Sequence, residues 1–128
     1  MAAMSDYLEN ALLNATLRGT AYTAPTNVYL ALFTTDPTDA GTGTEVAGGG
    51  YVRQKATFTA PTNGASPSAA DVLYPIASAA WGTVTHVGIY DALTAGNLLY
   101  HGVLTNSKTI ASSDQLKVAA GDITVTLA

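Results

Sequence analysis

Cysteine is absent from this chain of 128 residues, and charged side chains are scarce. Without cysteine there can be no disulfide framework, no thiolate metal site and no cysteine nucleophile. Charged residues make up 11% of the sequence, against roughly 25% in an average globular protein. Either the monomer exposes a surface with few charges, made of Thr, Ser, Asn, Gly and Ala, or an assembly buries much of that surface. Because interface cores are depleted in charge, we favour assembly into a homo-oligomer.

Positive charge is the scarcer sign, since five Lys and Arg stand against nine Asp and Glu, for a net charge of −4. Nucleic acids and anionic membranes bind to basic patches, so we expect neither as a partner. No apolar run approaches the ~18 residues of a membrane span. The first ten residues, MAAMSDYLEN, lack the basic and apolar regions of a signal peptide. We therefore expect synthesis in the cytoplasm.

The length predicts one domain over residues 1–128, large enough to bury roughly two thirds of its unfolded surface. Within it we expect a helical arm at residues 1–19 and a β domain at residues 20–128. The helix is predicted by a capping residue, Ser5 or Asp6, and by an apolar stripe. The stripe consists of Leu8, Ala11, Leu12 and Ala15, widened by Leu13 and Leu17. Such a wide apolar face docks either on the chain's own sandwich or on a neighbouring subunit.

The β domain is organised around one hairpin. Two β-prone runs, residues 83–90 and 98–104, flank a turn-rich segment at 91–97. Both runs, and residues 27–33, are apolar on both faces, so we expect cover on both sides from a second sheet, a helix or a neighbouring subunit. Further strands are expected at 51–59, 71–74, 115–119 and 123–127, and a loop at 106–114. One N-terminal helix and about seven short strands predict a mainly β fold, an antiparallel β-sandwich or jelly roll.

A loop rich in Gly, Thr and Asp spans residues 34–50, and loops of such length are usually functional or disordered. Its acidic residues Asp36, Asp39 and Glu45 faintly resemble a calcium loop, but their spacing and the flanking strands do not fit one, so we expect no metal. Arg53 lies on the positively charged face of the following strand and is expected to meet solvent or an acidic neighbour. The candidate subunit contacts are Leu8, Leu12, Asp36, Asp39, Glu45 and Arg53.

Two histidines, His86 and His101, lie on the two arms of the hairpin. They would lie opposite each other, as a pH-sensitive pair, if Asp91 paired with Gly96 across a four-residue turn. Zinc needs three or four ligands and no third is evident, so we interpret both as hydrogen-bonded packing residues. Neither a nucleophile elbow nor a phosphate loop is present. We expect no catalytic residues and no cofactor, and therefore no enzyme.

Several stretches resemble a family of small virion proteins of tailed bacteriophages, often described as tail-fibre-like. They are MSDYLENALLN, VYLALFTTDPTDAGTGTEVAGGGYVRQ, WGTVTHVGIYDALTAGNLLYHGVL and AGDITVTL, which together span nearly the whole chain. In this resemblance Met4 matches the usual start, and residues 1–3 are an extension. The resemblance implies a β domain of the virion that acts by binding.

Two functions are consistent with this resemblance. The one we favour is a capsid-decorating, or cement, protein that forms trimers and bridges subunits of the major capsid protein. The alternative is a tail or tail-fibre component, either an adaptor or a receptor-binding module. A sugar-binding tip would need exposed aromatic residues, for which Tyr22, Tyr51 and Trp81 are the candidates, although in a sandwich such residues more often pack in the core.

Overall fold

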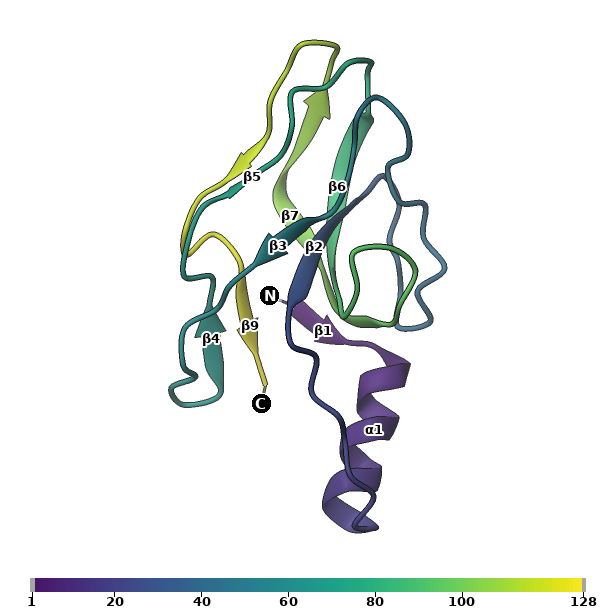
Figure 1. Ribbon diagram of the computed structural model, residues 1–128, viewed down its shortest axis with the longest axis vertical. Coiled ribbons are helices and arrows are strands. Elements are labelled where there is room, and N and C mark those ends of the chain that lie inside the picture. Colours follow the sequence, from purple (N-terminus) through teal and green to yellow (C-terminus); the bar gives the residue numbers. More distant parts are fainter. Residues whose placement is uncertain (1, 128) are drawn as a thin grey trace.

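A five-stranded antiparallel sheet forms the centre of the molecule, with smaller strand pairs on one side and loops on the other (Figure 1). The computed structural model describes residues 2–127, and Met1 and Ala128, the two ends of the expected domain, lie outside the described residues. The helix α1 spans Asp6–Leu17. The strands are β1 (Ala2–Met4), β2 (Val28–Phe33), β3 (Gln54–Ala56), β4 (Ala65–Pro67), β5 (Val72–Leu73), β6 (Gly82–Tyr90), β7 (Leu98–Ile110), β8 (Lys117–Val118) and β9 (Thr124–Thr126).

The central sheet has the strand order β1-β7-β6-β2-β3, with all neighbouring strands antiparallel. The β6–β7 hairpin that the sequence predicts lies in its middle. Two two-stranded sheets, β4–β9 and β5–β8, complete the sandwich. The prediction of a mainly β, antiparallel sandwich with one N-terminal helix is therefore confirmed. The strands β1 and β4 are additions that the sequence pattern did not reveal.

The main core lies on one face of the central sheet. Its buried residues include Leu30, Leu32, Val72, Val84, Val87, Ile89, Leu116 and Val118. The rings of Tyr51, Tyr74 and Trp81 pack together there, with centroids 5.5 to 6.2 Å apart. The Tyr74 hydroxyl donates to the Leu30 carbonyl at 2.6 Å, and the Trp81 indole donates to the Gly49 carbonyl at 2.9 Å. Tyr51 and Trp81 are therefore packing residues of the core.

The opposite face of the sheet carries a second buried cluster, made of Ala31, Phe33, Tyr90 and Leu98. The loop at residues 34–50, called the acidic loop from here on, lies over this cluster and buries Pro37. The backbone N–H of Thr34 donates to the Thr44 carbonyl at 2.9 Å, so the two ends of the loop meet, as in an Ω-loop. Cover on both sides is therefore present over β2 and the part of the hairpin next to its turn, but a loop provides it rather than a sheet, a helix or a neighbouring subunit. Farther along β7 the prediction is wrong, because Val103 is 64% exposed.

The strand β7 is longer than the sequence predicts. Residues 106–114 are predicted as a loop, but β7 continues through Ile110 and pairs with the start of β6. The hydroxyls of Thr83 and Thr109 lie 3.0 Å apart across this pair. The prediction failed because the side chains of residues 105–109 are polar and exposed, and so lack the apolar alternation by which a half-buried strand is recognised.

The arrangement in which His86 lies opposite His101 does not occur. His86 pairs with Val103, and His101 pairs with Gly88. The connection between the two strands spans residues 91–97, which is longer than four residues, and a register shift adjoins it. Because a side chain's position depends on register, this longer turn separates the two rings.

Two further expectations about strands are wrong. The strand expected at residues 51–59 is limited to β3. Of the two surroundings expected for Arg53, solvent is wrong because the residue is 8% exposed, whereas the acidic neighbour is present as Glu45. In the last strand, Ile123 and Val125 pack against the core as expected, but Leu127 is 44% exposed. The edge position of these short strands leaves too little pairing to impose a regular alternation.

Candidate assembly surface

Loops at one side of the sheet meet around the guanidinium group of Arg53. Its Nε and Nη2 atoms donate to the two carboxylate oxygens of Glu45, each at 2.9 Å. Its Nη1 atom donates to the carbonyls of Ala92 and Ala95, at 3.0 and 2.7 Å. The guanidinium carbon lies 3.7 Å from the centre of the Tyr90 ring, within cation–π range. These contacts, the Arg53 cluster, tie the acidic loop to the hairpin turn.

Tyr51 completes the Arg53 cluster. Its hydroxyl donates to Glu45 Oε2 at 2.6 Å and accepts from the Leu32 backbone N–H at 3.0 Å. Burial, followed by the hydrogen bond to Glu45, raises the pKa of Tyr51 far above its ordinary value. Burial by itself lowers the pKa of Arg53, but the hydrogen bonds and charge of Glu45 outweigh burial and raise it. The cluster is therefore a neutral hydroxyl beside a charged pair, and it serves the fold.

The start of α1 is fixed both to the sheet and to the acidic loop. Ser5 caps the helix, since its Oγ accepts from the Leu8 backbone N–H at 3.3 Å. The same hydroxyl donates to the Leu98 carbonyl at the start of β7. The backbone N–H of Asp6 donates to the Asp39 carbonyl at 2.9 Å. The helix therefore leaves the β domain from a defined position.

Carboxylates gather at this junction. Asp6, Glu9 and Asp39 each place one oxygen within 4.8 Å of the others. Asp39 Oδ1 also lies 2.7 Å from His101 Nε2. Acidic side chains in the first turn are favoured by the helix dipole, which accounts for Asp6 and Glu9 without a ligand. Calcium takes roughly six to eight oxygen ligands, so these three carboxylates supply at most half of such a set.

The N-terminal arm, defined as α1 and the following residues 18–27, is largely exposed. Figure 1 shows α1 extending away from the sheets, with the chain returning along it. Among residues 6–17, all of which are described, only Leu8 is buried. Leu13 is 55% exposed and Leu17 is 77% exposed. The side of α1 that carries these leucines is therefore largely open to solvent in the described chain.

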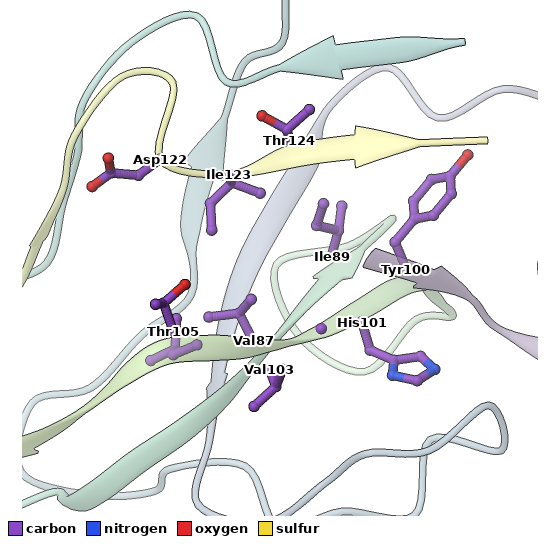
Figure 2. Close-up of a pocket in the computed structure, with 11 residues that line it drawn as sticks. Val87, Ile89, Tyr100, His101, Val103, Thr105, Asp122, Ile123 and Thr124 are labelled. Atoms are coloured by element: carbon purple, nitrogen blue, oxygen red, sulfur yellow. The ribbon is translucent and has the colours of Figure 1, made fainter. Parts of the chain in front are cut away.

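A small cavity opens between the β6–β7 hairpin and the segment that enters β9 (Figure 2). Val87 and Ile89 line one side, and Ile123 points toward them from the other. Its volume is about 90 Å³, well below the roughly 300–1,000 Å³ of small-molecule sites. Figure 2 shows the His101 ring pointing away from this space. The cavity is a gap between the layers, too small for a substrate.

Comparison with known families identifies the chain's relatives. A family model described as Podophage GP4 fiber I protein gp80 matches residues 3–126. The chain belongs to the gp80 family. No curated protein matches it. Membership makes it a phage structural protein of the fibre type, and it confirms the resemblance to virion proteins of tailed phages.

In this member of the gp80 family, the six residues expected as subunit contacts fall into three places. They are Leu8 and Leu12 on α1, Asp36 and Asp39 in the acidic loop, and Glu45 and Arg53 in the Arg53 cluster. Leu8 and Arg53 are buried within the chain, so neither presents its side chain to a neighbour. Asp36 and Asp39 lie beside His101, at 3.9 and 2.7 Å. The role of the exposed members in subunit contact stays a prediction.

The exposed leucines Leu13 and Leu17 are functional candidates that the sequence placed only at the margin of the apolar stripe. Their i, i+4 spacing, on the side of α1 away from Leu8, is the signal that identifies them. Within residues 2–127, no helix combines the length and the apolar character that crossing a membrane requires. The exposed side of α1 is therefore the candidate assembly surface of this gp80-family chain.

Proposed function

We propose that the chain is a non-enzymatic structural subunit of a phage fibre, and that its N-terminal arm docks on neighbouring protein in the virion. The observation that carries this proposal is the exposed apolar side of α1. An isolated helix shorter than about 12–15 residues is marginal in water, and most helices in proteins depend on tertiary packing. With 12 residues and one buried side chain, α1 has little packing of its own.

The β domain fits the role of a rigid body that carries this arm. Its own strands and loops bury an apolar cluster on each face of the central sheet, and the polar groups of Arg53 and Tyr51 are engaged with Glu45. Among the described residues, no buried side-chain polar atom lacks a hydrogen-bond partner. A domain whose buried polar groups are satisfied by its own fold suits binding and assembly better than catalysis.

The capsid-decorating role stays a prediction beside the fibre role. It rested partly on strands that are apolar on both faces, and β2 and the part of the hairpin next to its turn have cover within the chain. The family match favours a fibre component. Trimer formation and contact with the major capsid protein are likewise predictions that the oligomeric state and the copy number would test.

Copy number per virion is the experiment that separates these roles. Quantitative mass spectrometry of purified particles would compare this chain with the major capsid protein. We expect few copies per particle, and we expect labelled antibody against the chain to bind at the tail fibres. A ratio near one to one, with label spread over the head, would instead identify a cement protein. Absence of the chain from intact particles would overturn both roles.

A further inference from the structure

Three segments surround a hollow beside the start of α1. They are residues 5–7 at the cap and first turn of α1, residues 39–41 of the acidic loop, and residues 96–98 at the end of the hairpin turn (Figure 1). The volume of the hollow is about 410 Å³, within the roughly 300–1,000 Å³ of small-molecule sites. Its lining residues with polar side chains are Ser5, Asp6, Tyr7, Asp39, Tyr90 and Asn97.

Tyr90 supplies a polar atom that the fold leaves free. The residue is 9% exposed, and its hydroxyl makes no hydrogen bond within the described chain, although a buried tyrosine hydroxyl usually finds a partner. Because no buried side-chain polar atom of residues 2–127 lacks a partner, this hydroxyl must be in contact with solvent. Tyr90 lines the hollow, so its hydroxyl is available to a ligand there.

A second hollow shows what an occupied set of polar groups looks like. It has a volume of about 350 Å³ and lies beside the Arg53 cluster. The ionisable residues that line it are Glu45, Tyr51 and Arg53, which are joined by hydrogen bonds through Glu45. The hollow at the start of α1 differs from it, because the Tyr90 hydroxyl is not engaged by the fold.

The charges around the hollow at α1 restrict the ligand. Its charged lining residues are Asp6 and Asp39, and two carboxylates repel a phosphate, sulfate or carboxylate group. A cation would need an open aromatic face beside them, but the Tyr90 ring already carries the guanidinium of Arg53, 3.7 Å from its centre, and stacks with Phe33. The lining therefore favours a neutral ligand that donates hydrogen bonds.

The remaining polar groups are held in place as acceptors. The side-chain amide of Asn97 donates to Asp91 Oδ2 at 3.1 Å, which leaves its Oδ1 atom as an acceptor. Asp39 is fixed by two contacts, since its carbonyl accepts from the Asp6 backbone N–H at 2.9 Å and its carboxylate lies 2.7 Å from His101 Nε2. Tyr7, which is 43% exposed, adds an aromatic ring to this polar lining.

From this chemistry we propose that the hollow binds a neutral saccharide. Sugar hydroxyls donate to the carboxylates of Asp6 and Asp39 and to the Asn97 amide oxygen, and the Tyr90 hydroxyl donates to the sugar. The C–H face of the sugar packs on the ring of Tyr7. The inference goes beyond the structural role of the chain, because it gives the junction of arm and β domain a ligand of its own.

NMR titration of the purified full-length protein tests the site. The probes are glucose, galactose, mannose and N-acetylglucosamine, with methylamine as the cationic comparison. We expect at least one sugar to shift the amide signals of residues 5–7, 39–41 and 96–98, with a Kd in the millimolar range. Tyr90→Phe keeps the ring and removes only the free hydroxyl, so the Kd should rise about three- to tenfold, as for one lost hydrogen bond. Tyr100→Phe, at a half-buried tyrosine that does not line the hollow, is the matched control and should leave the Kd unchanged.

Three results would overturn the proposal. The first is that none of the sugars shifts these signals. The second is equal sugar affinity in Tyr90→Phe and the natural protein, which would mean that the sugar binds elsewhere. The third is that methylamine binds more tightly than every sugar and is lost in Asp6→Asn, which would identify a cation site. All these measurements use purified protein, so they are separate from the copy number in virions that tests the fibre role.

Discussion

At the scale of single residues, Arg53 is a positively charged side chain that is buried within the chain because its own loops supply the hydrogen-bond acceptors. Its guanidinium makes two hydrogen bonds to Glu45 and two to backbone carbonyls of the hairpin turn. A planar fork can serve all four acceptors at once, whereas the single ammonium of lysine cannot. Arg53, which the sequence suggested for subunit contact, thus connects the acidic loop to the hairpin turn within its own chain.

Replacing Arg53 with lysine should therefore destabilise the protein although the charge is kept. We expect Arg53→Lys to lower the free energy of unfolding by about 1.5–3 kcal/mol, the range for hydrogen bonds to charged groups. Urea denaturation measures this, and hydrogen exchange should increase in residues 91–97. The reverse exchange, Lys55→Arg at an exposed position of β3, is the control and should change stability by less than about 0.5 kcal/mol. Equal effects of both exchanges would contradict this role.

Buried tyrosines predict a loss of stability in alkali. Burial is the main cause that raises the pKa of Tyr51, Tyr74 and Tyr90 above the ordinary value. Their folded-state pKa exceeds the unfolded one, so their contribution is complete below pH 10 and declines above it, where unfolding releases a proton. Between its unfolded pKa, about 10, and its raised folded pKa, each such tyrosine lowers the free energy of unfolding by up to about 1.4 kcal/mol per pH unit. Denaturation between pH 8 and 11 should show this slope, and Tyr51→Phe should make it shallower. An unchanged slope in Tyr51→Phe would exclude Tyr51 as a contributor.

At the scale of elements, the arm depends on how α1 begins. The Ser5 hydroxyl both caps the helix and bonds to the Leu98 carbonyl. We expect Ser5→Ala to cost about 1–2 kcal/mol, because it removes both the helix cap and the buried hydrogen bond to the Leu98 carbonyl. Amide exchange in the first turn should rise with it. Thr16→Ala, which removes an exposed hydroxyl bond within the helix, is the matched control and should have little effect. Similar losses in both variants would contradict a special role for Ser5.

The sequence predicted the elements well where a local signal existed. The helix is predicted at residues 5–19 and observed at Asp6–Leu17, because both the cap and the apolar stripe are local. The second half of β7 was missed because its residues 105–109 are exposed and polar. The register of His86 and His101 could not be deduced, since it depends on a turn of seven residues, 91–97, and a bulge. Pairing of β1 with β7 is a contact between distant segments, which no local pattern encodes.

At the scale of the whole molecule, a strand apolar on both faces predicts cover but does not say what provides it. The sequence left open a sheet, a helix or a neighbouring subunit, and the structure assigns the outer face of β2 to the acidic loop. The low fraction of charged residues indicated that the protein assembles with other subunits. In the described chain, the exposed apolar side chains available for such contacts include Leu13 and Leu17 of the arm.

A clean test of the arm must leave the β domain intact. Deleting residues 1–19 would not do so, since β1 pairs with Tyr100–Gly102 of the sheet and Ser5 bonds to β7. Point substitutions on the exposed side of α1 avoid this problem, because Leu13 and Leu17 lie on the side away from Leu8.

We therefore expect the double variant Leu13→Gln, Leu17→Gln to keep the stability of the natural protein, within about 0.5 kcal/mol for each exposed site, and to be incorporated poorly into virions. Urea denaturation measures the first quantity, and mass spectrometry of particles grown with the variant measures the second. Leu73→Gln with Ile76→Gln is the matched control, because these two apolar residues are 53% and 61% exposed and lie outside the arm. Incorporation should fall in the arm variant and persist in the control. If the arm variant enters virions as well as the control, α1 is only an element of the fold, and the docking surface must lie on the β domain.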